Sequence, residues 1–148
     1  MISRVKNVIQ NSLPLIVWKP EFDLGIHIVD EHHKGILSAI NSLYYEIQQK
    51  RGGSVLVPIF KIMYEFAHIH FKIEEEFFEK FNYPDAVSHR VLHNELMDTL
   101  SKIGEKSILS KDPYQLMDFQ KKWWIDHVCN KDRVFRDYLI DKSFIEEV

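Results

Sequence analysis

The feature that most constrains this chain is a set of polar residues that interrupt otherwise apolar helical stripes. Four segments carry apolar side chains three or four positions apart, a spacing that places them on one face of an α-helix. Each stripe is interrupted by histidine, and one also by glutamate, where the pattern predicts a buried side chain. The interrupting residues are His33, His70, Glu74, His89, His93 and His127.

Three predicted turns separate these segments, which are too long to be strands. The helices are expected at about 28–50, 56–81 and 85–109, with a fourth that begins near Pro113. The turns are expected at "RGGS" (51–54), "NYPD" (82–85) and "SKDP" (110–113), because Gly, Pro, Asn and Asp favour turn conformations. Such short connections favour antiparallel neighbours. We therefore predict an all-α fold, an up-down-up-down antiparallel four-helix bundle.

The length of 148 residues is sufficient for one domain with a sizeable core, so a single domain is expected over 1–148. Residues 1–27 are predicted to form an irregular N-terminal arm that packs through Trp18 and Phe22. Residues 28–132 are predicted to form the bundle that carries the site, and 133–148 a short C-terminal helical segment.

The interrupting residues are expected to meet inside the bundle. If successive helices alternate in direction, His33 near the start of one helix lies beside His70 near the end of the next. His89 and His93 then lie beside His127 in the same way. All four helices therefore contribute polar groups to one end of the bundle.

Polar groups that converge in a core need a partner. A buried carboxylate without one costs several kcal/mol, and a bound transition-metal dication removes this cost because neutral imidazole and carboxylate are good ligands. A single buried histidine, or one His-x-x-x-His pair such as His89 and His93, is more often structural. The alignment of these residues on four core stripes favours metal, and five imidazoles with a carboxylate exceed the needs of one tetrahedral zinc ion. Two metal ions are predicted.

Asp132 is a further candidate ligand. It follows His127 by five residues, which on a continuous α-helix turns it about 140° away from that histidine. Asp132 can reach the same centre only if the helix ends or bulges near Cys129 and Asn130, where asparagine makes a break plausible. Otherwise it is a solvated residue in the charged "NKDR" segment.

Charge and cysteine content exclude several other functions and locations. The net charge is -3 and the basic residues are scattered, which gives no case for binding nucleic acid or an anionic membrane. Cys129 is the only cysteine, which suits a reducing compartment. The N-terminal segment is interpreted as mature protein rather than a signal peptide, and no stretch reaches the roughly 18 apolar residues of a membrane span. We expect a cytoplasmic protein.

The motifs together resemble the hemerythrin family, particularly the bacterial single-domain hemerythrins. The resemblance rests on "IVDEHHK", "HFKIEEEF", "HRVLH" and "WWIDHVCNKD", and extends from about Trp18 to Leu139. It implies two iron ions joined by a single bridging oxygen atom and by the carboxylates of Glu74 and Asp132. One iron would take the three histidines His89, His93 and His127, and the other His33 and His70.

The resemblance also implies a function. The iron with two histidines would have a free position where dioxygen binds reversibly, as in a non-enzymatic oxygen carrier, store or sensor. A sensor would need a protein partner. Ile36, Phe66 and Trp123 are predicted to line the oxygen pocket, although ordinary core packing explains each of them equally well.

One departure from the family pattern affects the first helix. This chain has His32 where the pattern Asp-x-Gln-His-Lys has glutamine. His33 is assigned as the ligand because it lies on the apolar stripe, and His32 is expected either beside the site or at the surface. His27 and His68 are not expected to be ligands.

Three other classes compete with the oxygen binder. A di-iron oxidase, peroxidase or nitric oxide-handling enzyme is the main alternative, although the two Glu-x-x-His motifs of ferritin-like sites are absent. A metal-stabilised module that binds another protein could use an outward aromatic residue of the pairs Phe77-Phe78 or Trp123-Trp124. A zinc-only site is disfavoured by the number of ligands.

Overall fold

The fold is helical throughout the part of the chain that can be described. The computed structural model describes residues 16–148, apart from the side chain of Glu147. The long elements are α2 (His27–Gln48), α3 (Gly52–Lys80), α4 (Ala86–Ser110), α5 (Tyr114–Trp123), the π-helix η2 (Trp124–Lys131) and α6 (Asp132–Asp141). Two short 3₁₀ turns, η1 (Pro20–Phe22) and η3 (Ile145–Glu147), flank them. The predicted all-α class is confirmed.

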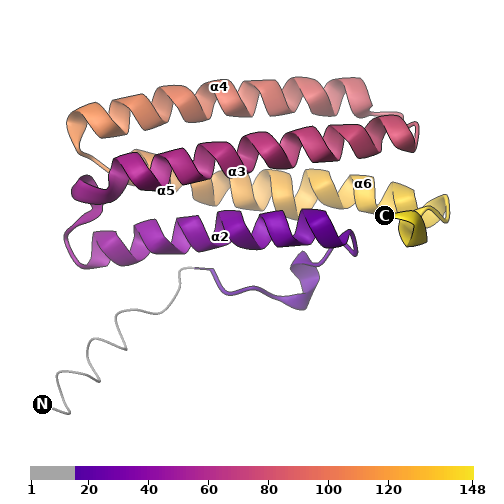
Figure 1. The fold of residues 1–148 in the computed structure, drawn as a ribbon, viewed down its shortest axis with the longest axis horizontal. Helices are drawn as coiled ribbons and strands as arrows, with labels where there is room; N and C mark the ends of the chain where they lie inside the picture. The colour runs from indigo at the N-terminus through magenta and orange to yellow at the C-terminus, as the bar shows by residue number, and fades with distance from the viewer. Residues whose placement is uncertain (1–15) are drawn as a thin grey trace, which may run out of the picture.

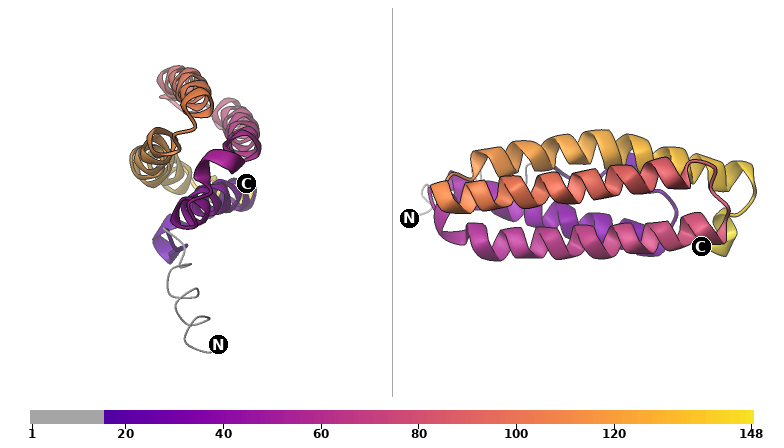
Figure 2. Two further views of the ribbon diagram at one scale, coloured as in Figure 1. Left: turned by 90° about the vertical axis from the view of Figure 1, so that its left-hand side faces the viewer. Right: turned by 90° about the horizontal axis from the view of Figure 1, so that it is seen from above.

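Four rods lie side by side along the long axis of the molecule (Figures 1 and 2). Three are α2, α3 and α4, and the fourth is the continuous run α5–η2–α6. Helix α3 packs against α2 and α4, and α5 packs against α2 and α4. The ribbon colour in Figure 1 runs in opposite directions along successive rods, which are joined by short connections. The predicted packing of four helices is therefore present.

The predicted turn at 51–54 is wrong, because α3 already begins at Gly52. The connection consists of Gln49–Arg51, and Lys50 adopts a left-handed conformation with φ of 59°. Gly52 serves close packing here: a Cβ at this position would lie 2.9 Å from side-chain carbons of both Ile47 and Pro113. The glycines therefore let the first turn of α3 approach the neighbouring loops.

The other two predicted turns are confirmed. Asn82 lies between α3 and α4 with φ of 49°, and Lys111 follows α4 with φ of 55°. Pro113 is the N-cap of α5, one position from the place expected for it. The fourth rod is longer than the predicted bundle segment, because α6 continues past Asp132 to Asp141.

The interior of the bundle has three layers. One apolar cluster fills the end where α2 meets α3 and α4 meets α5, and includes Leu43, Leu56, Leu100 and Leu116. A second cluster, at the opposite end, includes Leu24, Phe78, Phe135 and Leu139. Between them lies a layer of buried histidines and carboxylates.

The described part of the N-terminal arm is anchored to the bundle, as predicted. The rings of Trp18 and Phe22 pack edge-to-face against Trp124, with centroids 6.2 and 5.3 Å away. Asp30 accepts hydrogen bonds from the backbone N–H groups of Leu24 and Gly25 at 2.9 and 3.1 Å. These contacts fix the arm at the start of α2. Residues 1–15 of the predicted arm lie outside the described residues.

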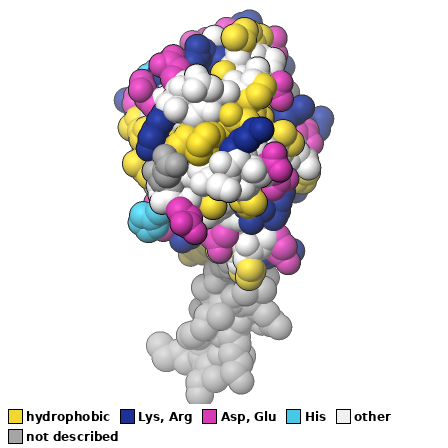
Figure 3. Space-filling view, turned by 90° about the vertical axis from the view of Figure 1, so that its right-hand side faces the viewer, with side chains coloured by type: hydrophobic (Ala, Val, Ile, Leu, Met, Phe, Trp, Pro, Cys, Tyr) yellow, Lys and Arg dark blue, Asp and Glu magenta, His cyan; other side chains and the backbone are white. Residues whose placement is uncertain are grey.

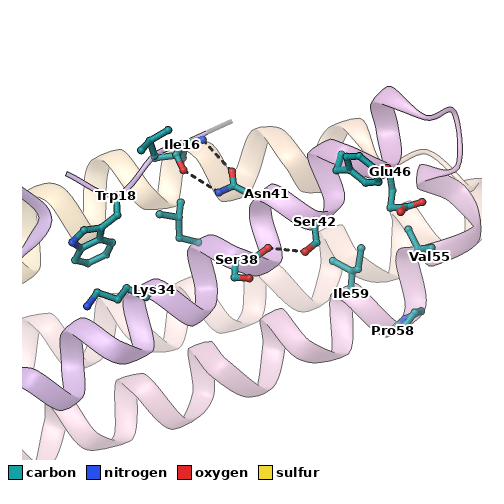
Figure 4. Close-up of a pocket in the computed structure, with 13 residues that line it drawn as sticks. Ile16, Trp18, Lys34, Ser38, Asn41, Ser42, Glu46, Val55, Pro58 and Ile59 are labelled. Atoms are coloured by element: carbon teal, nitrogen blue, oxygen red, sulfur yellow. Dashed lines mark hydrogen bonds between the residues drawn. The ribbon is translucent and has the colours of Figure 1, made fainter. Parts of the chain in front are cut away.

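A second anchor lies beside a surface groove of about 730 Å³. The backbone N–H of Ile16 donates to Asn41 Oδ1 at 3.0 Å, and Asn41 Nδ2 donates to the carbonyl of Ile16 at 2.9 Å (Figure 4). The groove runs along α2 and the start of α3, and none of the buried histidines lines it.

The surface carries mixed charges. On the end of the molecule drawn in Figure 3, Lys and Arg side chains alternate with Asp and Glu, and apolar side chains lie among them. Among residues 16–148, no helix combines the length and apolar character needed to cross a bilayer.

Candidate metal centre

The polar layer draws on all four rods. His33 comes from α2, His70 and Glu74 from α3, and His89 and His93 from α4, while His127 lies in η2 and Asp132 begins α6. Each of the seven residues is at most 6% exposed, and Glu74, His33, His70 and Asp132 are 0% exposed. The structure therefore brings together every residue that the sequence predicted as a metal ligand.

The histidines form two sets that face one another through their Nε2 atoms. His33 and His70 form the first, with Nε2 atoms 3.1 Å apart. His89, His93 and His127 form the second, in which the Nε2 of His127 lies 3.4 Å from that of His89 and 3.2 Å from that of His93.

The two carboxylates lie between these sets. Asp132 Oδ2 is 3.0 Å from His33 Nε2, and its Oδ1 is 3.0 Å from His127 Nε2. Glu74 Oε2 is 3.3 Å from His70 Nε2 and 3.5 Å from His93 Nε2. Possible ligand atoms of Glu74, the second histidine set and Asp132 lie within 4.8 Å of one another, as do those of the first set and Asp132. This geometry suits two cations that share two carboxylates.

The position of Asp132 depends on the π-helix. Residues Trp124–Lys131 form i→i+5 turns, in which residues five apart lie on the same side, as His127 and Asp132 do. The predicted bulge is confirmed, although it spans eight residues rather than a break at Cys129 and Asn130. The solvated alternative is wrong, since Asp132 is fully buried.

Burial lowers the pKa values of the histidines, whereas the two carboxylates raise them. Burial lowers the pKa of His33 and of His93. Burial also acts to lower the pKa of His70, but the nearby carboxylates of Asp132 and Glu74 outweigh it and raise this pKa to about 9. The first histidine set therefore contains one readily protonated imidazole and one that resists protonation.

The pKa values of both carboxylates are lowered in this setting. Burial acts to raise the pKa of Asp132, yet the neighbouring imidazoles, led by His127, hold it well below its ordinary range. The pKa of Glu74 is lowered by His70 and His93 in spite of burial and of the nearby Asp132 charge. Two negative charges therefore lie in the centre of the bundle.

Hydrogen bonding alone does not satisfy these groups. Neither carboxylate oxygen of Glu74 or of Asp132 has a hydrogen-bond partner of good geometry, although each is buried. His93 donates from Nδ1 to Glu75 at 3.0 Å, so its Nε2 presents a lone pair to Glu74 and His127. Acceptors that face acceptors repel unless a cation lies between them. The donor set of imidazole and carboxylate fits such a cation, and exceeds what one four-coordinate zinc ion uses.

Glu75 is the residue that the sequence interpretation missed. It is 8% exposed and lies beside the glutamate assigned as a ligand, in the run "EEE". A signal was present, because Glu75 follows the buried Phe71 by four residues and therefore shares its helix face. Phe71 stacks on His93 with ring centroids 4.0 Å apart and an interplanar angle of 11°.

The other histidines lie outside the two sets. His27 and His68 are exposed. His32 is partly buried, with its ring centroid 6.1 Å from that of His70, and its Nδ1 has no hydrogen-bond partner among the described residues.

The three residues predicted for an oxygen pocket occupy different places. Ile36 and Trp123 line a small apolar cavity of about 10 Å³ together with Phe71. Trp123 also stacks on His127 at 6.0 Å with an interplanar angle of 11°. Phe66 is partly buried against Gly35, whose added Cβ would lie 2.7 Å from its ring, and does not line this cavity.

Comparison with known proteins matches the same region of the chain. The family model for the hemerythrin HHE cation binding domain matches residues 24–139. A bacteriohemerythrin of Clostridium acetobutylicum is 26% identical over 129 residues, which cover 83% of this chain and 100% of that protein. A hemerythrin-like protein of Naegleria gruberi is 27% identical over 122 residues, covering 82% of this chain and 92% of the relative. A bacteriohemerythrin of Stenotrophomonas maltophilia is 22% identical over 126 residues, which cover 84% of this chain and 82% of that protein.

Proposed function

Because this chain belongs to the hemerythrin family, we propose that it binds dioxygen reversibly at a non-haem di-iron centre. The observation that carries the proposal is the division of the buried ligands into sets of two and three histidines, with Asp132 and Glu74 each within 3.5 Å of a histidine of both sets. A structural role for the same residues would leave the carboxylate oxygens without partners.

Each residue has a role in this proposal. His89, His93 and His127 would hold one iron, and His33 and His70 the other. Glu74 and Asp132 would be ligands shared by both iron ions. When bound, the two metal ions supply the electrons and the open coordination position that dioxygen requires.

The surrounding side chains would exclude water and protons from the site. For Ile36 and Trp123 this role is supported by the small apolar cavity that they line next to Phe71. The ring of Trp124 lies 6.1 Å from that of His33, on the side of the two-histidine set. Phe66 remains a prediction for the oxygen pocket.

The proposal describes a carrier, store or sensor rather than an enzyme. Five imidazoles and two carboxylates form a ligand set richer in nitrogen than the carboxylate-rich sites of di-iron oxidases. An oxidase, peroxidase or nitric oxide-handling enzyme is the alternative that the experiment below addresses.

The proposal also includes the organisation of the molecule. We take residues 1–148 as a single hemerythrin-like domain with up-down-up-down topology, supported by the extent of the family match and the short connections between rods. A cytoplasmic location is supported by the single cysteine, Cys129.

Anaerobic reduction followed by cycles of dioxygen admission and removal tests the function. We expect about two irons per chain and a visible charge-transfer band that appears with dioxygen and disappears when it is removed. Immediate, irreversible conversion to the oxidised form would favour the enzyme alternative. Failure to bind iron would overturn the proposal.

A further inference from the structure

The candidate ligand histidines differ in what their outer nitrogen contacts. Each presents Nε2 to the polar layer, so that Nδ1 points away from it and would carry the proton when Nε2 binds a metal ion. The Nδ1–H of His93 donates to Glu75 Oε1 at 3.0 Å. The Nδ1 atoms of His33, His70 and His127 are buried and have no hydrogen-bond partner among the described residues. His93 therefore has a carboxylate that these three histidines lack.

Glu75 is placed for this contact by the geometry of α3. Successive residues of an α-helix are rotated by about 100°, so Glu74 points into the polar layer while Glu75 points toward α4. Its other oxygen, Oε2, lies 3.3 Å from Lys72 Nζ and 3.9 Å from Arg90 Nε. The carboxylate is thus held between one buried imidazole and two surface cations.

The ring of His93 is also fixed from its face. Phe71 stacks on it almost in parallel, at 4.0 Å between ring centroids. The stacking limits tilt of the ring, and the hydrogen bond to Glu75 sets its rotation and its tautomer. Together they direct the Nε2 lone pair of His93 to the polar layer.

We propose that Glu75 is a positioning residue for the metal centre. It keeps the proton of His93 on Nδ1 and strengthens Nε2 as a donor, which makes the three-histidine set the tighter of two metal positions. This inference rests on the proposed function, because it requires that the buried histidines and carboxylates bind metal. Outer carboxylate partners of this kind typically change metal affinity or activity by about 10–100-fold.

Glu75 could instead serve only to form surface ion pairs with Lys72 and Arg90. Two observations favour the role toward His93. The Glu75 side chain is only 11% exposed, whereas those of Lys72 and Arg90 are 62% and 37% exposed. The contact with His93, at 3.0 Å, is also shorter than either contact with a cation.

Four variants separate these roles. Glu75→Gln keeps an acceptor oxygen of similar size but removes the charge, and Glu75→Ala removes the acceptor. Arg90→Gln removes a cation near Oε2 and leaves His93 untouched. Glu76→Gln is the matched control, because Glu76 is the next residue on α3, of the same type, and exposed.

The measurement is the rate at which a chelator removes Co²⁺ from the full chain, followed by the visible absorption of the metal. In the wild-type protein we expect a slow and a fast phase. Glu75→Ala should accelerate the slow phase by about 10–100-fold, with Glu75→Gln intermediate. Arg90→Gln and Glu76→Gln should leave both phases within about twofold, since outer-shell contacts to the ligands are intact.

A second readout reports on the hydrogen bond itself. In the Co²⁺ protein, the Nδ1–H protons of bound histidines give exchangeable, strongly shifted NMR signals. Glu75→Gln should move one of these signals and leave the others in place, which a merely structural role would not do. Because Glu75→Gln conserves volume, it decides the matter even if Glu75→Ala fails to fold.

The outcomes distinguish this inference from the proposed function. If the wild-type chain fails to bind Co²⁺ and iron, the proposed function and this inference both fall. If it binds metal but Glu75→Gln releases it like the wild type, only the role of Glu75 is overturned. The role is also overturned if Arg90→Gln accelerates release as much as Glu75→Gln.

Discussion

At one end of the bundle the rods meet through Leu43, Leu56 and Leu116, each at most 1% exposed. Toward the other end, the same rods meet through five histidines and two carboxylates that are at most 6% exposed. Burial of each leucine contributes about 1.5–3 kcal/mol to folding. Burial of each unpaired polar group opposes folding. Different segments of the same helices therefore act on stability in opposite directions.

This difference shows how the fold tolerates its own site. The polar layer lies between two apolar clusters, and aromatic rings of both clusters contact its histidines: Phe71 from one side and Phe78 from the other. The apolar ends can hold the helices in place against the cost of burying the polar layer. Metal binding then adds free energy to a folded scaffold, because an ion that binds the native state alone stabilises it.

The largest expected effect is the loss of bound metal when a shared ligand is removed, a change that concerns the polar layer and not the apolar end. Asp132→Asn removes the charge that lies between both histidine sets, so at least one metal ion should be lost. The decrease in metal affinity should exceed the about 10–100-fold change expected for a residue, such as Glu75, that only hydrogen-bonds to a ligand. Metal content per chain after gel filtration is the measurement. Asp126→Asn, an exposed position in the same π-helix, is the control, and equal metal content in the two variants would contradict the assignment.

A substitution at the apolar end should lower the stability of the fold and leave metal binding unchanged. Leu43→Ala removes a fully buried side chain and should lower the free energy of unfolding by about 2–5 kcal/mol. The decrease should be the same with and without metal, because no ligand is disturbed. Chemical denaturation of both forms measures it. Val57→Ala, at a position 43% exposed, should cost far less, and a change in metal content of Leu43→Ala would show that the two ends are coupled.

Gly104 offers a sharper test of packing at the apolar end. Glycine to alanine usually stabilises a helix by up to about 1 kcal/mol, but a Cβ here would lie 2.0 Å from the ring of Phe60. We expect Gly104→Ala to destabilise by about 1–3 kcal/mol instead. The double variant with Phe60→Leu should recover part of the loss in thermal unfolding. A stabilised single variant would show that the ring moves aside freely.

The same comparison explains what could be predicted from the sequence. Apolar periodicity predicted four helices, and its interruptions identified six ligand candidates, because helical spacing alone places them on the inner face. The start of α3 was missed because Gly52 resembles a turn residue, whereas it is required by the nearby Ile47 and Pro113. That requirement exists only once the loops are packed together.

Asp132 and Glu75 show where periodicity fails. Asp132 required a change in helix type, which depends on local hydrogen bonding rather than on apolar spacing. Periodicity could have indicated that Glu75 is buried, but its role required knowledge of which residue of α4 lies opposite, since its partner is eighteen positions away. Both depend on contacts that the pattern within one helix does not contain.

The last effect expected is a dependence of stability on pH that is confined to the polar layer. In the metal-free protein the pKa of His70 is raised from 6.5 to about 9. The stability that its protonated form contributes is complete below pH 6.5 and is lost as the pH rises through about 9. Between these two pH values we expect the free energy of unfolding to fall by about 1 kcal/mol per pH unit. His89, whose pKa Asp132 raises against the effect of burial, adds a loss of the same sign.

Denaturation of the metal-free protein between pH 6.5 and about 9 measures this slope. His70→Gln should reduce it, whereas His68→Gln, at an exposed position of the same helix, should not. Leu43→Ala should lower the whole curve and keep its slope, because the apolar end does not titrate. Metal should flatten the curve, since an ion at the Nε2 of His70 displaces its proton. A slope that survives in His70→Gln and in the metal-loaded protein would mean that the titrating group lies outside the polar layer.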